Sequence, residues 1–134
     1  MSSLVVPKCF AKPLRWKDEV YNTTYALWVG PWDRCIKWAR SDKYPEDLEL
    51  GSAACTFWSE EGRSVTLWLG DEPMSHAQWD SIVAHEALHA AWGVLDSSGV
   101  RFTKESTEAF TYYLGWIVKQ ISSRIEYRKA KGNE

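Results

Sequence analysis

The five-residue segment HEALH, residues 85–89, constrains this chain more than any other feature. It lies within an apolar-rich stretch from Trp79 to Leu95 that is typical of an amphipathic helix. Residues four apart on a helix lie one turn above each other on the same face. His85 and His89 can therefore present two imidazole nitrogens to a single metal ion.

Glu86 lies about 100° around the helix from His85, so it is next to the metal without being forced to bind it. This position suits a general base that acts on metal-bound water. The alternative is an ordinary helix whose histidines are surface or core residues. The apolar run 82–84 before the motif predicts a largely buried helix, in which an unpaired Glu-His-His group would be costly. We therefore favour a metal site.

The segment resembles the HExxH pattern of the zincin family of peptidases. The resemblance implies a Zn²⁺ cofactor bound by His85 and His89, a peptide or protein substrate, and Glu86 as the catalytic base. A catalytic zinc ion needs three protein ligands and an open position for water. His76 falls on the opposite side of the same helix and no histidine follows His89, so a carboxylate on the next helix, Glu105 or Glu108, remains.

Glu108 is the ligand that the resemblance implies. Eighteen residues lie between His89 and Glu108, a separation close to that in gluzincins. The surrounding sequence STEAFTYYLGW resembles the glutamate helix of small phage or prophage HExxH proteins and of ImmA/IrrE-type peptidases. Glu105 has an alternative role near the helix start, where it offsets the helix dipole or accepts a hydrogen bond from a ligand imidazole. A cysteine ligand is a further alternative.

Tyr112, one turn after Glu108, is the candidate donor to the transition-state oxyanion, with ordinary helix packing as the alternative. Trp92, one turn beyond His89, is the tryptophan expected to line the cleft. The edge of the predicted hairpin is expected to accept an extended peptide by strand addition.

The remaining elements follow from residue patterns and predict an α+β fold, a compact minimal zincin in a single domain. A small sheet is expected to pack on the HExxH helix and on the following glutamate-bearing helix. Ser75 and Gln78 predict a capping box at the start of the HExxH helix, and Gly93 predicts its end. Strands are expected at 21–29, 53–58 and 64–69, with a loop at 41–51 and helices at 31–40, 76–92 and from Thr103 or Ser106 to about 124.

At 134 residues the chain is long enough for one domain. We expect an extended or loosely packed N-terminal arm (1–18), a zincin-like metallopeptidase domain (19–125) and a charged C-terminal tail (126–134). No apolar run approaches the length of a membrane span and no signal peptide is recognisable, so no membrane association is expected. Three scattered cysteines favour free thiols and a cytoplasmic location.

The net charge of −2 conceals a strong segregation along the chain. Residues 1–17 contain four basic and no acidic residues, and residues 119–134 contain five basic and two acidic ones. The middle of the chain, residues 18–118, contains 16 acidic and seven basic residues, so we expect no nucleic-acid binding there. Two functions remain open: a zinc metallopeptidase, or a catalytically silent zincin-fold binding protein with zinc as a structural ion. The oligomeric state is left open.

Overall fold

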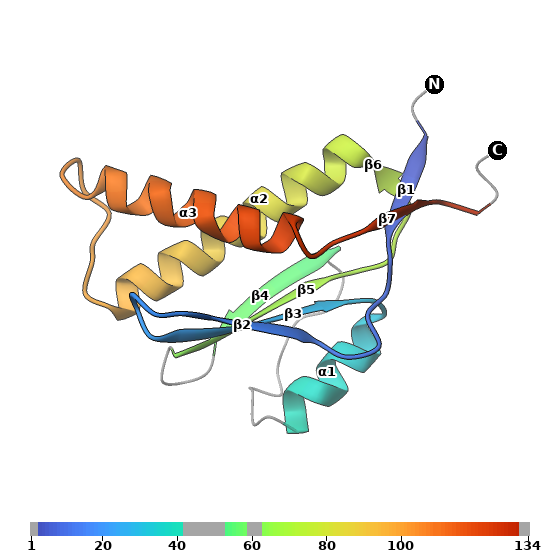
Figure 1. Cartoon of the computed structure of the whole chain (residues 1–134), viewed down its shortest axis with the longest axis horizontal. Coiled ribbons are helices and arrows are strands. Elements are labelled where there is room, and N and C mark those ends of the chain that lie inside the picture. Colours follow the sequence, from blue (N-terminus) through green and yellow to red (C-terminus); the bar gives the residue numbers. More distant parts are fainter. Residues whose placement is uncertain (1–2, 42–52, 59–62, 132–134) are drawn as a thin grey trace.

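Two β-sheets and three helices form the described part of the chain, residues 3–41, 53–58 and 63–131 of the computed structural model (Figure 1). The α+β class predicted from the sequence is confirmed. The larger sheet has the strand order β2 (Leu14–Asp18), β3 (Thr23–Val29), β5 (Ser64–Leu69) and β4 (Ala54–Trp58). The smaller sheet has the order β6 (Met74–Ser75), β1 (Leu4–Pro7) and β7 (Tyr127–Lys129). The helices are α1 (Trp32–Ser41), α2 (His76–Ser97) and α3 (Thr107–Ser122).

The larger sheet combines a parallel centre with antiparallel edges. Strands β3 and β5 are parallel, whereas β2 pairs antiparallel with β3 and β4 pairs antiparallel with β5. The predicted hairpin strands at 53–58 and 64–69 are thus confirmed as neighbours, in a register that runs from Ala54 opposite Leu69 to Trp58 opposite Val65. The predicted turn between them, and most of the loop expected at 41–51, lie outside the described residues.

The central strand β3 is buried on both faces because helices cover both sides of the sheet (Figure 1). Helices α2 and α3 lie on one side, where Tyr25, Leu27 and Val29 belong to the main apolar core with residues of both helices. Helix α1 lies on the other side, where Trp28 joins Cys35 and other buried residues in a second cluster. Strands that are buried on both faces need apolar residues at successive positions, as the sequence of β3 has.

Helix α2 begins where the sequence predicted and ends later than predicted. The Ser75 side chain accepts a hydrogen bond from the Gln78 amide, and the Gln78 side chain accepts one from the Ser75 amide, which completes the capping box. The prediction of an end near Gly93 is wrong, because the helix continues to Ser97. Gly93 has a packing role instead: a Cβ atom at this position would overlap the indole ring of Trp58 on β4.

We expect Gly93→Ala to destabilise the protein by about 1–3 kcal/mol, because an extra methyl group must displace the Trp58 ring. The clash outweighs the gain of about 1 kcal/mol that alanine brings to a helix interior. Gly115→Ala in α3 is the matched control, since a Cβ there meets no atom within 4 Å. Urea unfolding should show a neutral or stabilising effect for Gly115→Ala, and equal effects of the two changes would contradict this packing argument.

Helix α3 begins where the predicted cap at Ser106 places it and ends slightly earlier than predicted. It begins at Thr107, with Ser106 in the N-cap position but without a side-chain capping bond, and it ends at Ser122. Five apolar residues at helical spacing form a stripe along α3, of which four are buried and Leu114 is half-buried. The four buried residues are Phe110, Tyr113, Ile117 and Ile121.

Both ends of the chain are integrated into the sheets. Residues 1–18 were expected to form an extended or loosely packed arm; the described part is extended, but β1 and β2 within it are paired strands. The predicted charged tail at 126–134 contributes β7, which pairs with β1 in a register from Val5 opposite Lys129 to Pro7 opposite Tyr127. The pairing between β1 and β7 therefore joins the two basic ends of the chain. No helix in the described ranges is long and apolar enough to cross a membrane.

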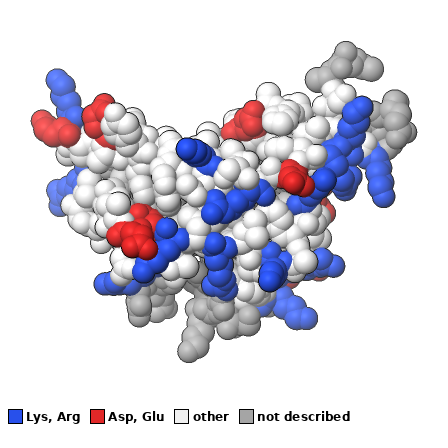
Figure 2. All heavy atoms as spheres, in the orientation of Figure 1, with Lys and Arg blue, Asp and Glu red and all other residues white. Residues whose placement is uncertain are grey.

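Basic side chains from these two ends gather on one face of the molecule. Figure 2 shows Lys and Arg side chains over the face that carries β2, β7 and the C-terminal end of α3. Two contacts belong to this arrangement: the Arg124 guanidinium lies 4.2 Å from the ring centre of Trp16 on β2, and Lys8 pairs with Glu126 at 3.3 Å. Charged residues on an edge strand such as β2 oppose pairing with another chain. The expectation that the protein binds no nucleic acid remains a prediction.

A buried polar network links α3 to the β2–β3 hairpin. The Tyr113 hydroxyl donates to Asp18 Oδ2 at 2.7 Å and is also hydrogen-bonded to the Tyr25 hydroxyl. Burial raises the pKa of Tyr25 and Tyr113 above the usual tyrosine value of about 10, and in Tyr113 the Tyr25 and Asp18 contacts raise it further. Both hydroxyls therefore stay protonated in the folded protein at a pH where they ionise in the unfolded chain.

We expect alkaline pH to destabilise the protein through these two hydroxyls. A raised folded-state pKa gives stability that is complete below about pH 10 and is lost as the pH rises, by about 1.4 kcal/mol per pH unit for each tyrosine. Urea unfolding between pH 8 and pH 11 should show this decline. Tyr113→Phe should make it shallower, whereas Tyr112→Phe, which alters a side chain that is 76% exposed, should not. Identical slopes for wild type and Tyr113→Phe would contradict the prediction.

Candidate metal centre

The two motif histidines lie on the solvent-facing side of α2. His85 and His89 are both exposed, whereas Glu86 and Ala87 between them are buried. The expectation of a largely buried helix is thus correct for one face only. The buried face of α2 packs on the main core, with Trp79, Val83, Ala90, Ala91, Val94 and Leu95. The histidines are accessible to an ion and to a second molecule.

The imidazoles of His85 and His89 point at each other. Their Nε2 atoms are 3.1 Å apart and their ring centres 4.8 Å apart. Two nitrogens bound to a tetrahedral zinc ion at about 2.0–2.1 Å are themselves about 3.3 Å apart, so the observed spacing is close to that of a ligand pair. A hydrogen bond between one protonated and one unprotonated Nε2 accounts for the same distance in the absence of metal. The predicted pairing of these two residues is present.

Glu86 is held against the edge strand β4 beneath the histidines. It is 7% exposed, and its Oε1 accepts a hydrogen bond of 2.7 Å from the Thr56 hydroxyl. Its other oxygen, Oε2, lies 3.9 Å from His85 Nε2. One carboxylate oxygen is thus fixed by the sheet while the other faces the histidine pair, the arrangement that a general base beside a metal ion requires.

Thr56 is a residue of this site that the sequence did not indicate. Its hydroxyl lies 3.1 Å from the Glu86 carbonyl oxygen as well as bonding the carboxylate, so it ties β4 to α2 at the motif itself. A single threonine in a strand carries no sequence signal for such a role, because threonine is common in strands. Only the packing of β4 against α2 identifies it.

A small hollow adjoins His85 and Glu86. It has a volume of about 260 Å³ and lies between the start of β4 and the middle of α2. Its remaining lining residues are Ala53, Ala54, Ser81 and Ile82. Small side chains on β4 thus leave open space next to the buried carboxylate.

The structure does not bring the predicted third ligand to the histidines. Glu108 lies in the first turn of α3 and is exposed, as is Glu105 in the preceding turn. Within residues 3–41, 53–58 and 63–131, no group of three His, Cys, Asp or Glu side chains is arranged to hold a metal ion. Two of the expected ligands therefore fit zinc by their geometry, and the role of Glu108 stays a prediction.

Tyr112 and Trp92 lie in different surroundings. Tyr112 is 76% exposed and lines a second hollow between α3 and the β2–β3 turn, which shares no lining residue with the hollow beside His85. Its role as an oxyanion donor stays a prediction. Trp92 is 49% exposed and packs against Phe102 and Phe110, with ring centres 5.5 Å away in each case. An apolar surface thus follows His89 along the exposed face of α2.

The thiols show no sign of a role at the metal site. Cys35 is fully buried between α1 and the sheet, and burial, together with the neighbouring Cys55, raises its pKa to about 12. A thiol with such a pKa is a poor metal ligand, since metals bind the thiolate. All three cysteines are free, and Cys9 is exposed.

The site consists of an exposed histidine pair on α2, a buried carboxylate beside it, and a threonine on β4 that orients the carboxylate. These features are typical of a metal site with a neighbouring base. No family model, curated protein or solved structure matches this chain.

Proposed function

We propose that this protein is a zinc-dependent peptidase, of the HExxH type, that acts in the cytoplasm on a peptide or protein. One observation carries the proposal: the Nε2 atoms of His85 and His89 face each other at 3.1 Å on an exposed helix face, with the buried Glu86 carboxylate 3.9 Å from His85 Nε2. A buried carboxylate costs free energy unless it is used or paired, and a purely structural histidine pair does not need it.

Zinc, when bound, supplies a Lewis acid that lowers the pKa of a coordinated water and polarises the scissile carbonyl. His85 and His89 would hold it, with Glu108 as the ligand expected from the sequence. Glu86 then takes a proton from the attacking water and delivers it to the leaving amine. The hydrogen bond from Thr56 keeps the Glu86 carboxylate in one orientation during both transfers. The Glu86 backbone, bonded by the same hydroxyl, stays fixed to β4.

Two surfaces near the histidines suit an extended peptide with apolar side chains. Strand β4 pairs only with β5 among the described strands and is thus at the edge of the larger sheet, the position at which strand addition occurs. Leu88 and Trp92 on α2, together with Phe102, are about half exposed. Exposed apolar side chains that gather on one face mark a binding surface.

We expect the purified protein to bind one zinc ion per chain and to cleave peptides from a mixed library. Chelation should abolish cleavage and added Zn²⁺ should restore it, while magnesium should not, because imidazoles suit zinc and hard cations prefer oxygen ligands. Metal analysis by mass spectrometry and cleavage analysis on the same sample provide the measurement. A protein with no zinc after purification and after zinc dialysis would contradict the proposal.

A second function is a binding role, which the exposed apolar side chains of Leu88, Trp92 and Phe102 near the histidines would serve without turnover. We therefore keep open a binding protein that has this site without turnover, with zinc as a structural ion. The two functions differ in peptide cleavage and in partner retention. A binder would be zinc-loaded, would cleave no peptide, and would retain a partner equally well in the wild type and in the Glu86→Gln variant.

A further inference from the structure

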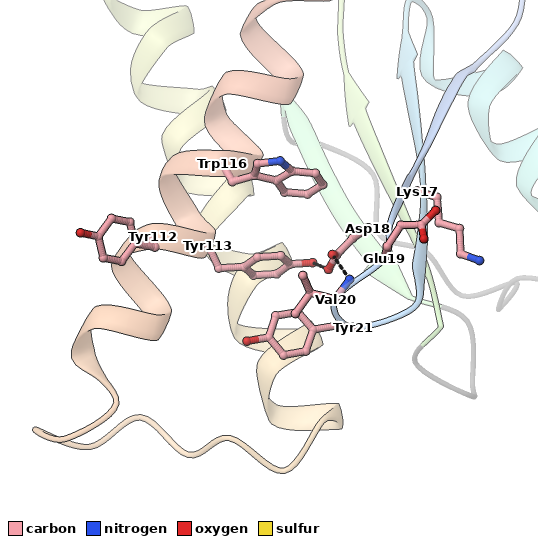
Figure 3. A pocket seen from close by; sticks show the side chains of 8 residues that line it. All are labelled: Lys17, Asp18, Glu19, Val20, Tyr21, Tyr112, Tyr113 and Trp116. Atoms are coloured by element: carbon pink, nitrogen blue, oxygen red, sulfur yellow. Dashed lines mark hydrogen bonds between the residues drawn. The ribbon is translucent and has the colours of Figure 1, made fainter.

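A second hollow lies between α3 and the β2–β3 turn (Figure 3). Its volume is about 450 Å³, within the range of about 300–1,000 Å³ that is usual for small-molecule sites. Its lining is mostly aromatic and acidic: Lys17, Asp18, Glu19, Val20, Tyr21, Tyr112, Tyr113 and Trp116. None of these residues lines the hollow beside His85 and Glu86.

The carboxylate of Asp18 lies at the inner end of this hollow. Asp18 is 5% exposed, and each of its oxygens accepts one hydrogen bond, from the Val20 amide at 2.8 Å and from the Tyr113 hydroxyl at 2.7 Å (Figure 3). These bonds stabilise the hairpin turn and orient Tyr113, but a carboxylate can accept about four. Among the residues that the structure describes, no cation forms an ion pair with Asp18. A buried carboxylate normally has a positive partner.

Aromatic rings form the walls. The Tyr21 ring meets the Tyr113 ring edge to face, with centres 5.0 Å apart, and Trp116 is stacked on Tyr113 with centres 5.7 Å apart. In Figure 3 the rings of Trp116 and Tyr21 lie on either side of the Tyr113 ring, whose hydroxyl points at Asp18. The faces of tyrosine and tryptophan rings attract cations, and more strongly where water is excluded.

The charged residues at the rim do not neutralise Asp18. Lys17 precedes it in β2, and successive side chains of a strand point to opposite faces. In Figure 3 the Lys17 ammonium and the Glu19 carboxylate both point away from the rings. The interior of the hollow therefore combines a carboxylate that has no cationic partner among the described residues with apolar, cation-attracting walls.

We propose that this hollow binds a small organic cation, with an ammonium or guanidinium head near Asp18 and an apolar stem against the rings of Tyr21 and Trp116. The Asp18 carboxylate favours a positively charged ligand, and the aromatic rings favour an alkyl chain. Such a group exists in free amines and in the side chains of lysine and arginine. The site is independent of the histidine pair and of any peptidase activity.

The test compares a charged ligand with a neutral ligand of the same shape. n-Pentylammonium and n-pentanol are titrated into ¹⁵N-labelled full-length protein, and amide and indole shifts are followed by NMR. We expect saturable shifts confined to residues 17–21 and 112–116 with the ammonium, and at least about tenfold weaker binding of the alcohol, because the alcohol lacks the charge that complements Asp18. Equal binding of both, or shifts spread over the surface, would overturn the proposal.

Variants identify the group that recognises the charge. Asp18→Asn keeps the shape and should weaken pentylammonium binding at least about tenfold, while Glu19→Gln, the same charge change one residue along the chain, should change it less than about twofold. Should Asp18→Asn fail to fold, Tyr21→Leu takes its place: it retains apolar volume and should weaken binding of the ammonium more than that of pentanol. Unchanged ammonium affinity in a folded Asp18→Asn protein, or a Glu19→Gln effect as large as that of Asp18→Asn, would overturn the assignment.

A blocked lysine tripeptide distinguishes the two sources of the cation. Tighter binding of the peptide than of pentylammonium would support a protein side chain as the ligand. Binding of the free amine alone would support a small molecule. Both results support a cation site. If neither probe binds at concentrations up to tens of millimolar, the proposal is refuted.

Discussion

Glu86→Gln is expected to reduce peptide cleavage at least about 10²-fold, the lower range for the loss of general acid–base assistance. Glutamine can still accept the hydrogen bond from Thr56, so the contact between α2 and β4 is preserved. It cannot take a proton from water at neutral pH. The zinc content and the free energy of unfolding should remain close to those of wild type, because Glu86 is not expected to bind the metal.

The measurement is kcat/KM on the best library peptide, with zinc content determined on the same samples. Thr56→Val is the companion variant: it removes the hydroxyl that orients the carboxylate but leaves Glu86 itself in place. We expect an intermediate loss of activity, because the base remains but is no longer fixed in one orientation. A Glu86→Gln protein that cleaves at the wild-type rate would show that Glu86 is not the base.

His85→Ala and His89→Ala are each expected to abolish stoichiometric zinc binding, because each removes one of two facing imidazoles. A metal that binds only the folded state stabilises it, by about 2.7 kcal/mol at a free zinc concentration one hundred times Kd. Both variants should therefore lose the rise in Tm that added zinc causes in wild type. Metal analysis and thermal unfolding with and without zinc provide the two readouts.

His76→Ala is the matched control on the same helix. His76 lies near the N-terminal end of α2, where its Nε2 is 3.6 Å from Asp80 and its ring packs on Tyr127, so it should not affect zinc. Full zinc occupancy in both His85→Ala and His89→Ala would refute the site. Glu108→Ala and Glu105→Ala then test the third ligand: the sequence predicts loss of zinc for Glu108→Ala, and loss for Glu105→Ala alone would reverse that assignment.

Features that depend on neighbours along the chain were predictable. The capping box at Ser75 and Gln78 and the pairing of His85 with His89 both follow from helix geometry and from residue types within one or two turns. The strands at 23–29, 54–58 and 64–69 follow from apolar and β-branched runs between turn residues. The cap and the histidine pair form within the helix itself, whereas the strands are only indicated by their own residue types and form their hydrogen bonds with neighbouring strands.

The local sequence around Gly93 did not predict where helix α2 ends. Glycine ends many helices, and the local pattern gave no reason to continue beyond it. The helix nevertheless runs to Ser97, and Trp58 of β4 packs so closely against position 93 that a Cβ atom there would overlap its indole ring. The reason for this glycine lies 35 positions away in the chain, and no periodicity within α2 contains that information.

The residue types and their spacing along single elements were therefore sufficient to predict the α+β class, the helix with the histidine pair and the carboxylate next to it. The tertiary structure alone decided that β1 and β7 join the ends of the chain, that Thr56 orients Glu86, and that Asp18 lies buried among aromatic rings. The physical reason is distance along the chain. Turns, caps and helix faces form between residues a few positions apart, whereas strand order and buried polar contacts depend on which distant segments pack together, and many pairings satisfy the same local patterns.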